Sequence, residues 1–93
     1  MSIQFPSSAP EFRGWNLTVG FAALVDGSPV DCAVSAEALE DHCGASSPGQ
    51  ADLLHAFMTH RAKIEDLARR LLQDSKCKRL LLHSGHFRYH AAA

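Results

Sequence analysis

The chain has 93 residues, of which 46% are hydrophobic and 20% charged, with a formal net charge of −1. This balance excludes a disordered chain, and the length predicts a single domain over residues 1–93 with one small core. No apolar run approaches the ~20 residues that span a bilayer, and the N-terminus lacks the charged and apolar regions of a signal peptide. We therefore expect a cytoplasmic protein.

The cysteines and the charges are both informative. Cys32, Cys43 and Cys77 are odd in number and form no C-x-x-C pair, so we interpret them as free thiols. Up to Gln50 there are six acidic residues and one basic residue, whereas four acidic and eight basic residues follow. The two halves either attract each other within the fold or leave a basic surface for an anionic partner.

The N-terminal part shows the period-two alternation of strands. Residues 3–5 predict a short edge strand that Pro6 ends, residues 7–14 a loop, and residues 15–25 a long strand in which Gly20 marks a bulge or bend. Asp-Gly at 26–27 predicts a hairpin turn through residue 29, followed by a returning strand over residues 30–34. The apolar face of the long strand would carry Trp15, Leu17, Val19, Phe21, Ala23 and Val25.

Two helices are predicted in the middle of the chain. Ser35 can cap a short helix over residues 36–43, with Gly44 as its left-handed stop. Ser47 then begins one long amphipathic helix over residues 48–74. Its apolar stripe recurs at three- and four-residue intervals and consists of Leu53, Phe57, Ile64, Leu67, Ala68 and Leu71.

The C-terminal part predicts one further strand, over residues 79–83 and centred on three leucines. Residues 84–93 are interpreted as a small hairpin or a flexible tail outside the core, which would span about residues 3–83. The predicted order is β-β-β-α-α-β. Because strands precede helices, we expect an α+β fold with a small antiparallel sheet and one short and one long helix packed on one face.

Several of these segments resemble a known bacterial family, domain of unknown function 1488. The similarity rests on Phe21-Ala22, Gly27, the run at 30–35 and Ala38-Leu39, and in the long helix on Phe57, Arg61, Ile64 and Ala68. It extends from about Ile3 to Leu82 and implies a small α+β cytoplasmic protein without assigned catalytic residues. The histidine-rich end at 83–90 departs from the family pattern.

Two residues interrupt the stripe of the long helix and are candidates for a binding site. His60 falls among the apolar positions, where it is either a core histidine or a pH-sensitive group or base. Arg61 lies at the edge of the stripe, where its guanidinium would either extend to solvent or pair with a carboxylate such as Asp31 on the facing strand. We favour a structural pair over an anion-binding role. Cys32 faces inward as a small buried hydrophobe, and a nucleophilic Cys32 activated by His60 has no supporting motif.

Two further constellations could bind ligands. His83, His86 and His90 could supply three imidazoles to a transition metal, but the simpler interpretation is a solvated polar end. The basic residues of the C-terminal half could instead form a nucleic-acid patch, although pairs such as Glu65–Arg69 and Asp66–Arg70 would neutralise part of it. The patch would comprise Arg69, Arg70, Lys76, Lys78, Arg79 and Arg88.

No catalytic motif is present in the sequence, and no cofactor is expected. Our first hypothesis is a non-catalytic accessory or regulatory module that acts through protein contacts, as a homodimer. The edge strand and the helix flank residues Leu54, Met58 and Leu72, if exposed, would supply the contacts. Nucleic-acid binding by the basic half and metal binding by the terminal histidines are the alternatives.

Overall fold

The structure is a computed structural model that describes residues 1–74 and 77–90, with side chains through Arg88. The strands are β1 (Ile3–Gln4), β2 (Glu11–Arg13), β3 (Thr18–Val25), β4 (Ser28–Ser35) and β5 (Arg79–Leu82). The helices are α1 (Ala36–His42), α2 (Gln50–Thr59), α3 (Arg61–Asp74) and α4 (Ser84–His90). The predicted α+β class is confirmed.

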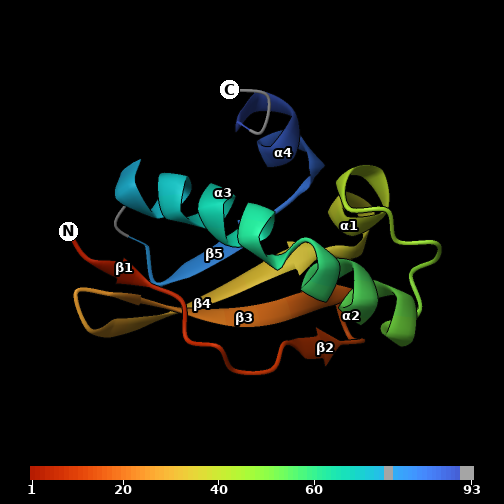
Figure 1. The fold of residues 1–93 in the computed structure, drawn as a ribbon, viewed down its shortest axis with the longest axis horizontal. Coiled ribbons are helices and arrows are strands. Elements are labelled where there is room, and N and C mark those ends of the chain that lie inside the picture. The colour runs from red at the N-terminus through yellow and green to blue at the C-terminus, as the bar shows by residue number, and fades with distance from the viewer. Residues whose placement is uncertain (75–76, 91–93) are drawn as a thin grey trace.

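The strands form one sheet in the order β1-β3-β4-β5, with β2 also paired to β3 (Figure 1). The prediction of an antiparallel sheet is correct for β1 to β4 and wrong for β5, which runs parallel to β4. Parallel neighbours need a long crossover connection, and α1, α2 and α3 provide it. The sheet is therefore mixed.

The hairpin between β3 and β4 forms at the predicted Asp-Gly turn. Val25 pairs with Ser28, so Asp26 and Gly27 are the two loop residues, with φ angles of 51° and 83°. Two positive φ angles identify the type I′ geometry that fits the twist of a hairpin. The register runs from Thr18–Ser35 to the turn without a bulge, so the bulge predicted at Gly20 is wrong.

The long strand is shorter than predicted, and the preceding loop contains a strand. Leu17 adopts a φ of 52° and β3 begins only at Thr18, so Trp15 and Leu17 lie outside the sheet and are exposed. β2 occupies part of the region predicted as a loop, and its Phe12 pairs with Val19.

The first helix agrees with its local signals. The Ser35 hydroxyl accepts a hydrogen bond from the Ala38 N–H at 3.1 Å, which is the predicted N-cap. Gly44 follows with a φ of 74°.

The long helix predicted over residues 48–74 is instead two helices. His60 leaves the helical conformation at φ −113°, ψ 23°, yet its N–H still donates to Ala56 and its carbonyl accepts from Ile64. The start also differs. Gly49 occupies the N-cap position of α2 without a side-chain cap, whereas the Ser47 hydroxyl donates to Asp52.

The predicted terminal hairpin is wrong, because residues 84–90 form α4. Phe87 is buried on this helix and its ring stacks on His42 of α1 at 5.3 Å. The Ser84 hydroxyl donates to Asp41 at 2.9 Å, which is a second link between α4 and α1. The core therefore extends beyond residue 83.

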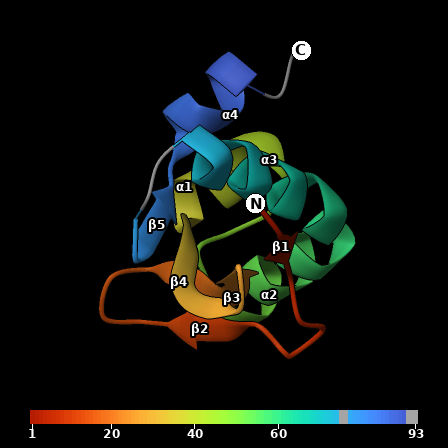
Figure 2. The same cartoon turned by 90° about the vertical axis from the view of Figure 1, so that its left-hand side faces the viewer.

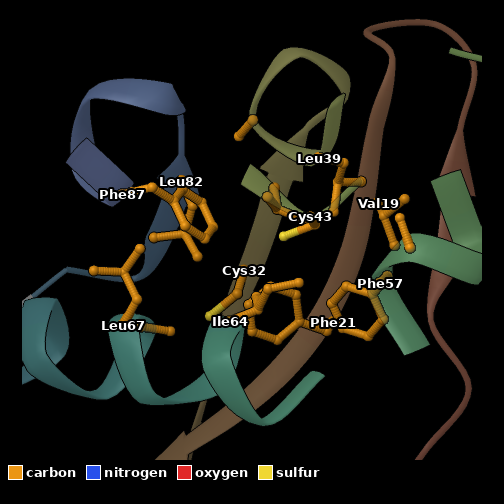
Figure 3. Close-up of a cluster of buried hydrophobic side chains, with 14 of the residues drawn as sticks. Val19, Phe21, Cys32, Leu39, Cys43, Phe57, Ile64, Leu67, Leu82 and Phe87 are labelled. Carbon is orange, nitrogen blue, oxygen red and sulfur yellow. The ribbon is translucent and has the colours of Figure 1, made fainter. Parts of the chain in front are cut away.

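All four helices lie on one face of the sheet (Figures 1 and 2). Their apolar side chains meet the inward residues of β3 and β4, as Figure 3 shows for Phe21, Cys32 and Phe57. Cys32 and Cys43 are buried and Cys77 is half-buried, and all three are free thiols as predicted. We call the opposite side of the sheet the outer face; among the described residues no helix covers it.

No helix within residues 1–74 and 77–90 has the length and apolar character that crossing a membrane requires.

Candidate functional site

The outer face of the sheet places polar and apolar side chains side by side. The strand register puts Arg13, Gly20, Asp31 and their neighbours on this face, because residues two apart along a strand share a side. Strand β5 adds two further residues on the outer face, Arg79 opposite Asp31 and Leu81 opposite Ala33. On β3 the outward positions 20 and 22 are glycine and alanine, so the middle of the outer face has no large side chains.

Arg13 and Asp31 form a two-bond ion pair across β3. Nη1 and Nη2 of Arg13 donate to the two carboxylate oxygens of Asp31 at 3.0 and 2.7 Å, and Nε donates to Glu11 at 2.9 Å. The hydrogen bonds from Arg13 lower the pKa of Asp31, while the same bonds raise the pKa of Arg13. Both groups therefore remain charged at neutral pH.

Gly20 makes this pairing feasible. A Cβ at position 20 would lie 2.5 Å from the guanidinium carbon of Arg13, which is closer than Cβ atoms approach their neighbours in proteins, so the Arg13 head group would have to move. The missing side chain lets the Arg13 guanidinium cross β3 and reach Asp31 on β4. The requirement at Gly20 is thus space on the outer face.

A shallow groove of about 540 Å³ runs across the outer face. We call it the outer groove. Two large apolar side chains on its walls are exposed to solvent, Trp15 by 83% and Leu81 by 50%. It is lined by Glu11, Arg13, Trp15, Asn16, Asp31, Ala33, Arg79, Leu80 and Leu81.

Arg79 is the cation of this groove that remains available. Arg13 already occupies both oxygens of Asp31, and Arg79 makes no hydrogen bond or ion pair with any residue in the described part of the chain. Its charge still contributes to the lowered pKa of Asp31, after the hydrogen bonds from Arg13. A carboxylate brought by a ligand could bind Arg79 without displacing a partner.

Arg61 does pair with a carboxylate, but its partner is Glu65 on the same helix. The suggested partner Asp31 is wrong, because Asp31 lies on the outer face and pairs there with Arg13. Arg61 bonds Glu65 at 2.9 Å and donates to the carbonyls of Pro6 and Ser8 at 3.1 and 2.9 Å. It therefore ties the segment between β1 and β2 to α3. His60 is half-buried at the break between α2 and α3, and not a core residue.

The basic residues predicted as a nucleic-acid patch do not gather on one surface. Arg69 lies over the Phe5 ring on the helical side, whereas Arg79 lies on the outer face. Asp66 pairs with Arg70 at 3.1 Å as predicted, and also with Arg69, whereas Glu65 pairs with Arg61 and not with Arg69. Of the others, Lys78 and Arg88 are exposed and Lys76 lies outside the described residues.

The terminal histidines form no metal centre within the residues that the structure describes. His83 and His86 stack with ring centroids 3.9 Å apart, and Nδ1 of His86 accepts the backbone N–H of His83. The side chain of His90 lies outside the described part. No group of three histidine, cysteine, aspartate or glutamate side chains that could hold a metal occurs in that part.

The Cys32 thiol and the flank residues of the predicted long helix were two further candidates for function. Burial raises the pKa of Cys32 to about 12, which leaves the thiol protonated and unsuited to nucleophilic attack. Of the helix-flank residues, Met58 is exposed, Leu54 is half-buried and Leu72 is buried, so the expected exposure of Leu72 is wrong.

Sequence reasoning missed Arg13, Trp15 and Leu81 as members of a surface site. The sequence predicts Trp15 on the apolar face of the long strand, because Trp15 continues the period-two alternation of Val19 and Phe21 backwards. The positive φ of Leu17, which ends that alternation, has no sequence signature. Arg13 did carry a signal, since it is the one basic residue before position 51. A lone cation amid acidic residues should suggest an ion pair.

Comparison with known proteins gives the family. No curated protein matches the chain. A crystal structure of a protein of unknown function from the DUF1488 family of Shewanella loihica PV-4 has a TM-score of 0.77 and 20% sequence identity, covering 87% of this chain and 91% of that one. At that identity the likeness shows the fold. The family model "Protein of unknown function (DUF1488)" matches residues 3–82, and the chain therefore belongs to this family.

Proposed function

We propose that this protein is a non-catalytic accessory or regulatory module that binds another protein through the outer groove. The observation that carries the proposal is the open exposure of Trp15 and Leu81 around the available cation of Arg79. Tryptophan and arginine are enriched among the residues that dominate binding energy at protein interfaces. We place this activity in the bacterial cytoplasm, in line with the sequence-based expectation.

The ion pair of Arg13 and Asp31 supports the proposal by fixing the floor of the groove. A two-bond arginine–carboxylate pair has one preferred geometry, so these side chains present a rigid surface that loses little freedom when a partner binds. The partner would place an apolar side chain between Trp15 and Leu81 and a carboxylate on Arg79.

The test compares the tagged wild-type protein with a Trp15→Ala, Arg79→Glu double variant in pull-downs from the native cytoplasm. The control is Met58→Ala, which removes a similarly exposed side chain from the helical side. We expect a partner that the wild type and the control retain and the double variant loses. Chemical-shift perturbation with the purified partner should then map to the outer groove. Equal retention by all three proteins, or shifts confined to the helices, would contradict the proposal.

A further inference from the structure

We propose that two copies of this chain associate by antiparallel pairing of their β5 strands, about a two-fold axis that passes beside Leu80. This dimer uses the edge of the sheet and does not depend on the partner of the outer groove. It would join the two sheets into one.

The first support is the direction of the peptide groups in β5. The carbonyl of Lys78 accepts the N–H of Asp31 at 3.2 Å, which fixes the ladder between β5 and β4. Successive peptide groups of a strand point to opposite sides, so Leu80 and Leu82 also face β4, whereas the N–H and C=O groups of Arg79 and Leu81 point away. Within residues 1–74 and 77–90 no strand pairs with that side. Figure 2 shows β5 at the margin of the sheet.

The second support is that this edge carries few of the usual protections. Free strand edges are commonly blocked by proline, by a bulge, by charged side chains or by being very short. Strand β5 is short and begins with Arg79, so the support comes from the residues that follow. Beta5 contains no proline, and its last three residues are leucines. Leu81 is 50% exposed and Leu80 is half-buried, so apolar surface lies on both sides of the open edge.

The third support is that only one symmetric register suits the residues. Centring the axis on Arg79 would place two guanidinium groups directly opposite each other, which is unfavourable. Centring it on Leu81 would place Arg79 opposite His83 of the second copy, and the His83 N–H would have to donate to that strand. This N–H already donates to Nδ1 of His86. Centring it on Leu80 pairs Arg79 with Leu81 of the second copy, so that all four outward N–H groups find carbonyls.

The same register explains why the occupant should be a second copy. It brings the two Leu80 side chains together at a closely spaced pair, so that half-buried apolar surface covers itself. The net charge of −1 gives little long-range repulsion between copies. An axis perpendicular to the sheet also keeps both outer grooves on the same side of the dimer.

Mass in solution tests the dimer. Light scattering on the wild type should give twice the monomer mass of 10.1 kDa. Leu81→Pro should give the monomer mass at the same concentrations, because proline removes a donor that points away from β4 and leaves the ladder intact. Leu81→Lys should do the same, and Met58→Lys should remain a dimer. A wild type that is monomeric at every concentration, or a folded dimeric Leu81→Pro, would overturn the proposal.

Cross-linking tests the register. In a Cys32→Ala, Cys77→Ser background, which removes the thiol that pairs with position 80 within the same copy, Leu80→Cys should form an intermolecular disulfide under mild oxidant, whereas Lys78→Cys should not. A dimer that cross-links equally through both positions, or through neither, would overturn the proposed pairing. Trp15→Ala should lose the outer-groove partner and keep the dimer mass, so that failure of the proposed function and failure of the dimer give different results.

Discussion

Asp31 keeps a lowered pKa because the Arg13 guanidinium reaches it across Gly20. We expect Gly20→Ala to push the Arg13 head group aside and to raise the pKa of Asp31 back toward the ordinary aspartate value of about 4. Titration of the Asp31 carboxyl carbon by NMR measures this directly. Arg13→Met should give the same upward shift, and an unchanged pKa in Gly20→Ala would contradict the steric role of the glycine.

The same pair makes stability depend on pH. A folded-state pKa below the unfolded value means that the pair stabilises the fold above about pH 4, and that this contribution disappears as the pH falls through the lowered pKa. The pair is partly exposed, so we expect Asp31→Asn to cost about 1 kcal/mol or less near pH 7. Urea unfolding of both proteins should show this difference shrinking as the pH falls below about 4 and vanishing once Asp31 is protonated in the folded state. A difference that grows in acid would contradict the assignment.

The three thiols should differ in reactivity. Burial raises the pKa of Cys32 to about 12 and also raises that of Cys43, whereas Cys77 is half-buried. Alkylation of the native protein at neutral pH should therefore modify Cys77 first, and the other two only after denaturant is added. Mass spectrometry of the digested protein identifies the sites. Comparable rates at Cys32 and Cys77 in the native protein would contradict the burial described.

At the scale of elements, Arg61 links the segment after β1 to the break between two helices. Its bonds to the carbonyls of Pro6 and Ser8 join parts of the chain that are distant in sequence. We expect Arg61→Ala to lower the free energy of unfolding by about 1–3 kcal/mol and to speed hydrogen exchange in the N-terminal segment. The control is Arg70→Ala, on the exposed side of α3. Equal effects of the two substitutions would show that the link is unimportant.

The elements that local signals determine were predictable, and those that depend on distant partners were not. Asp26-Gly27 and Ser35 act on their immediate neighbours, so the hairpin and the start of α1 follow from the sequence. The break at His60 does not, because the apolar period continues through it. The helix at 84–90 was missed because Phe87 and Tyr89 alternate as they would in a strand, while the burial of Phe87 depends on α1.

The candidate site was less predictable than the fold for the same reason. The sequence suggests Arg61 as the partner of Asp31 because the long helix faces that strand, whereas the carboxylate pairs with Arg13. A strand residue has two possible sides, and a shift of one position exchanges them. Cys32 and its neighbours fix the inner side of β4 and so place Asp31 outside, with Arg13 as the nearest cation.

At the scale of the whole molecule, the fold is two-layered: helices cover one side of the sheet, and no helix within residues 1–74 and 77–90 covers the other. The buried side accounts for most of the apolar residues, while the open side carries the outer groove and the edge of β5. The proposed binding surfaces are thus separated from the buried core, so substitutions at Trp15 or Arg79 should change binding of the proposed partner with little effect on unfolding.

The parallel pairing of β5 also has a consequence for how the chain folds. The hairpin of β3 and β4 needs only neighbouring residues, whereas Asp31 meets Arg79 only after three helices have been placed between them. Long loops close slowly, so β5 should join after the transition state. Leu82→Ala should then mainly speed unfolding and Gly27→Ala mainly slow refolding, as stopped-flow kinetics can measure. The reverse pattern would place β5 in the folding nucleus.

During synthesis the same order would hold, because β5 leaves the ribosome after the helices that precede it. Until then the edge of β4 that later pairs with β5 is unpaired. After β5 has joined, the outer edge of β5 becomes the free edge of the sheet. Pairing of β5 with its own β4 would therefore cover the edge of β4 and protect the chain from pairing with its neighbours there.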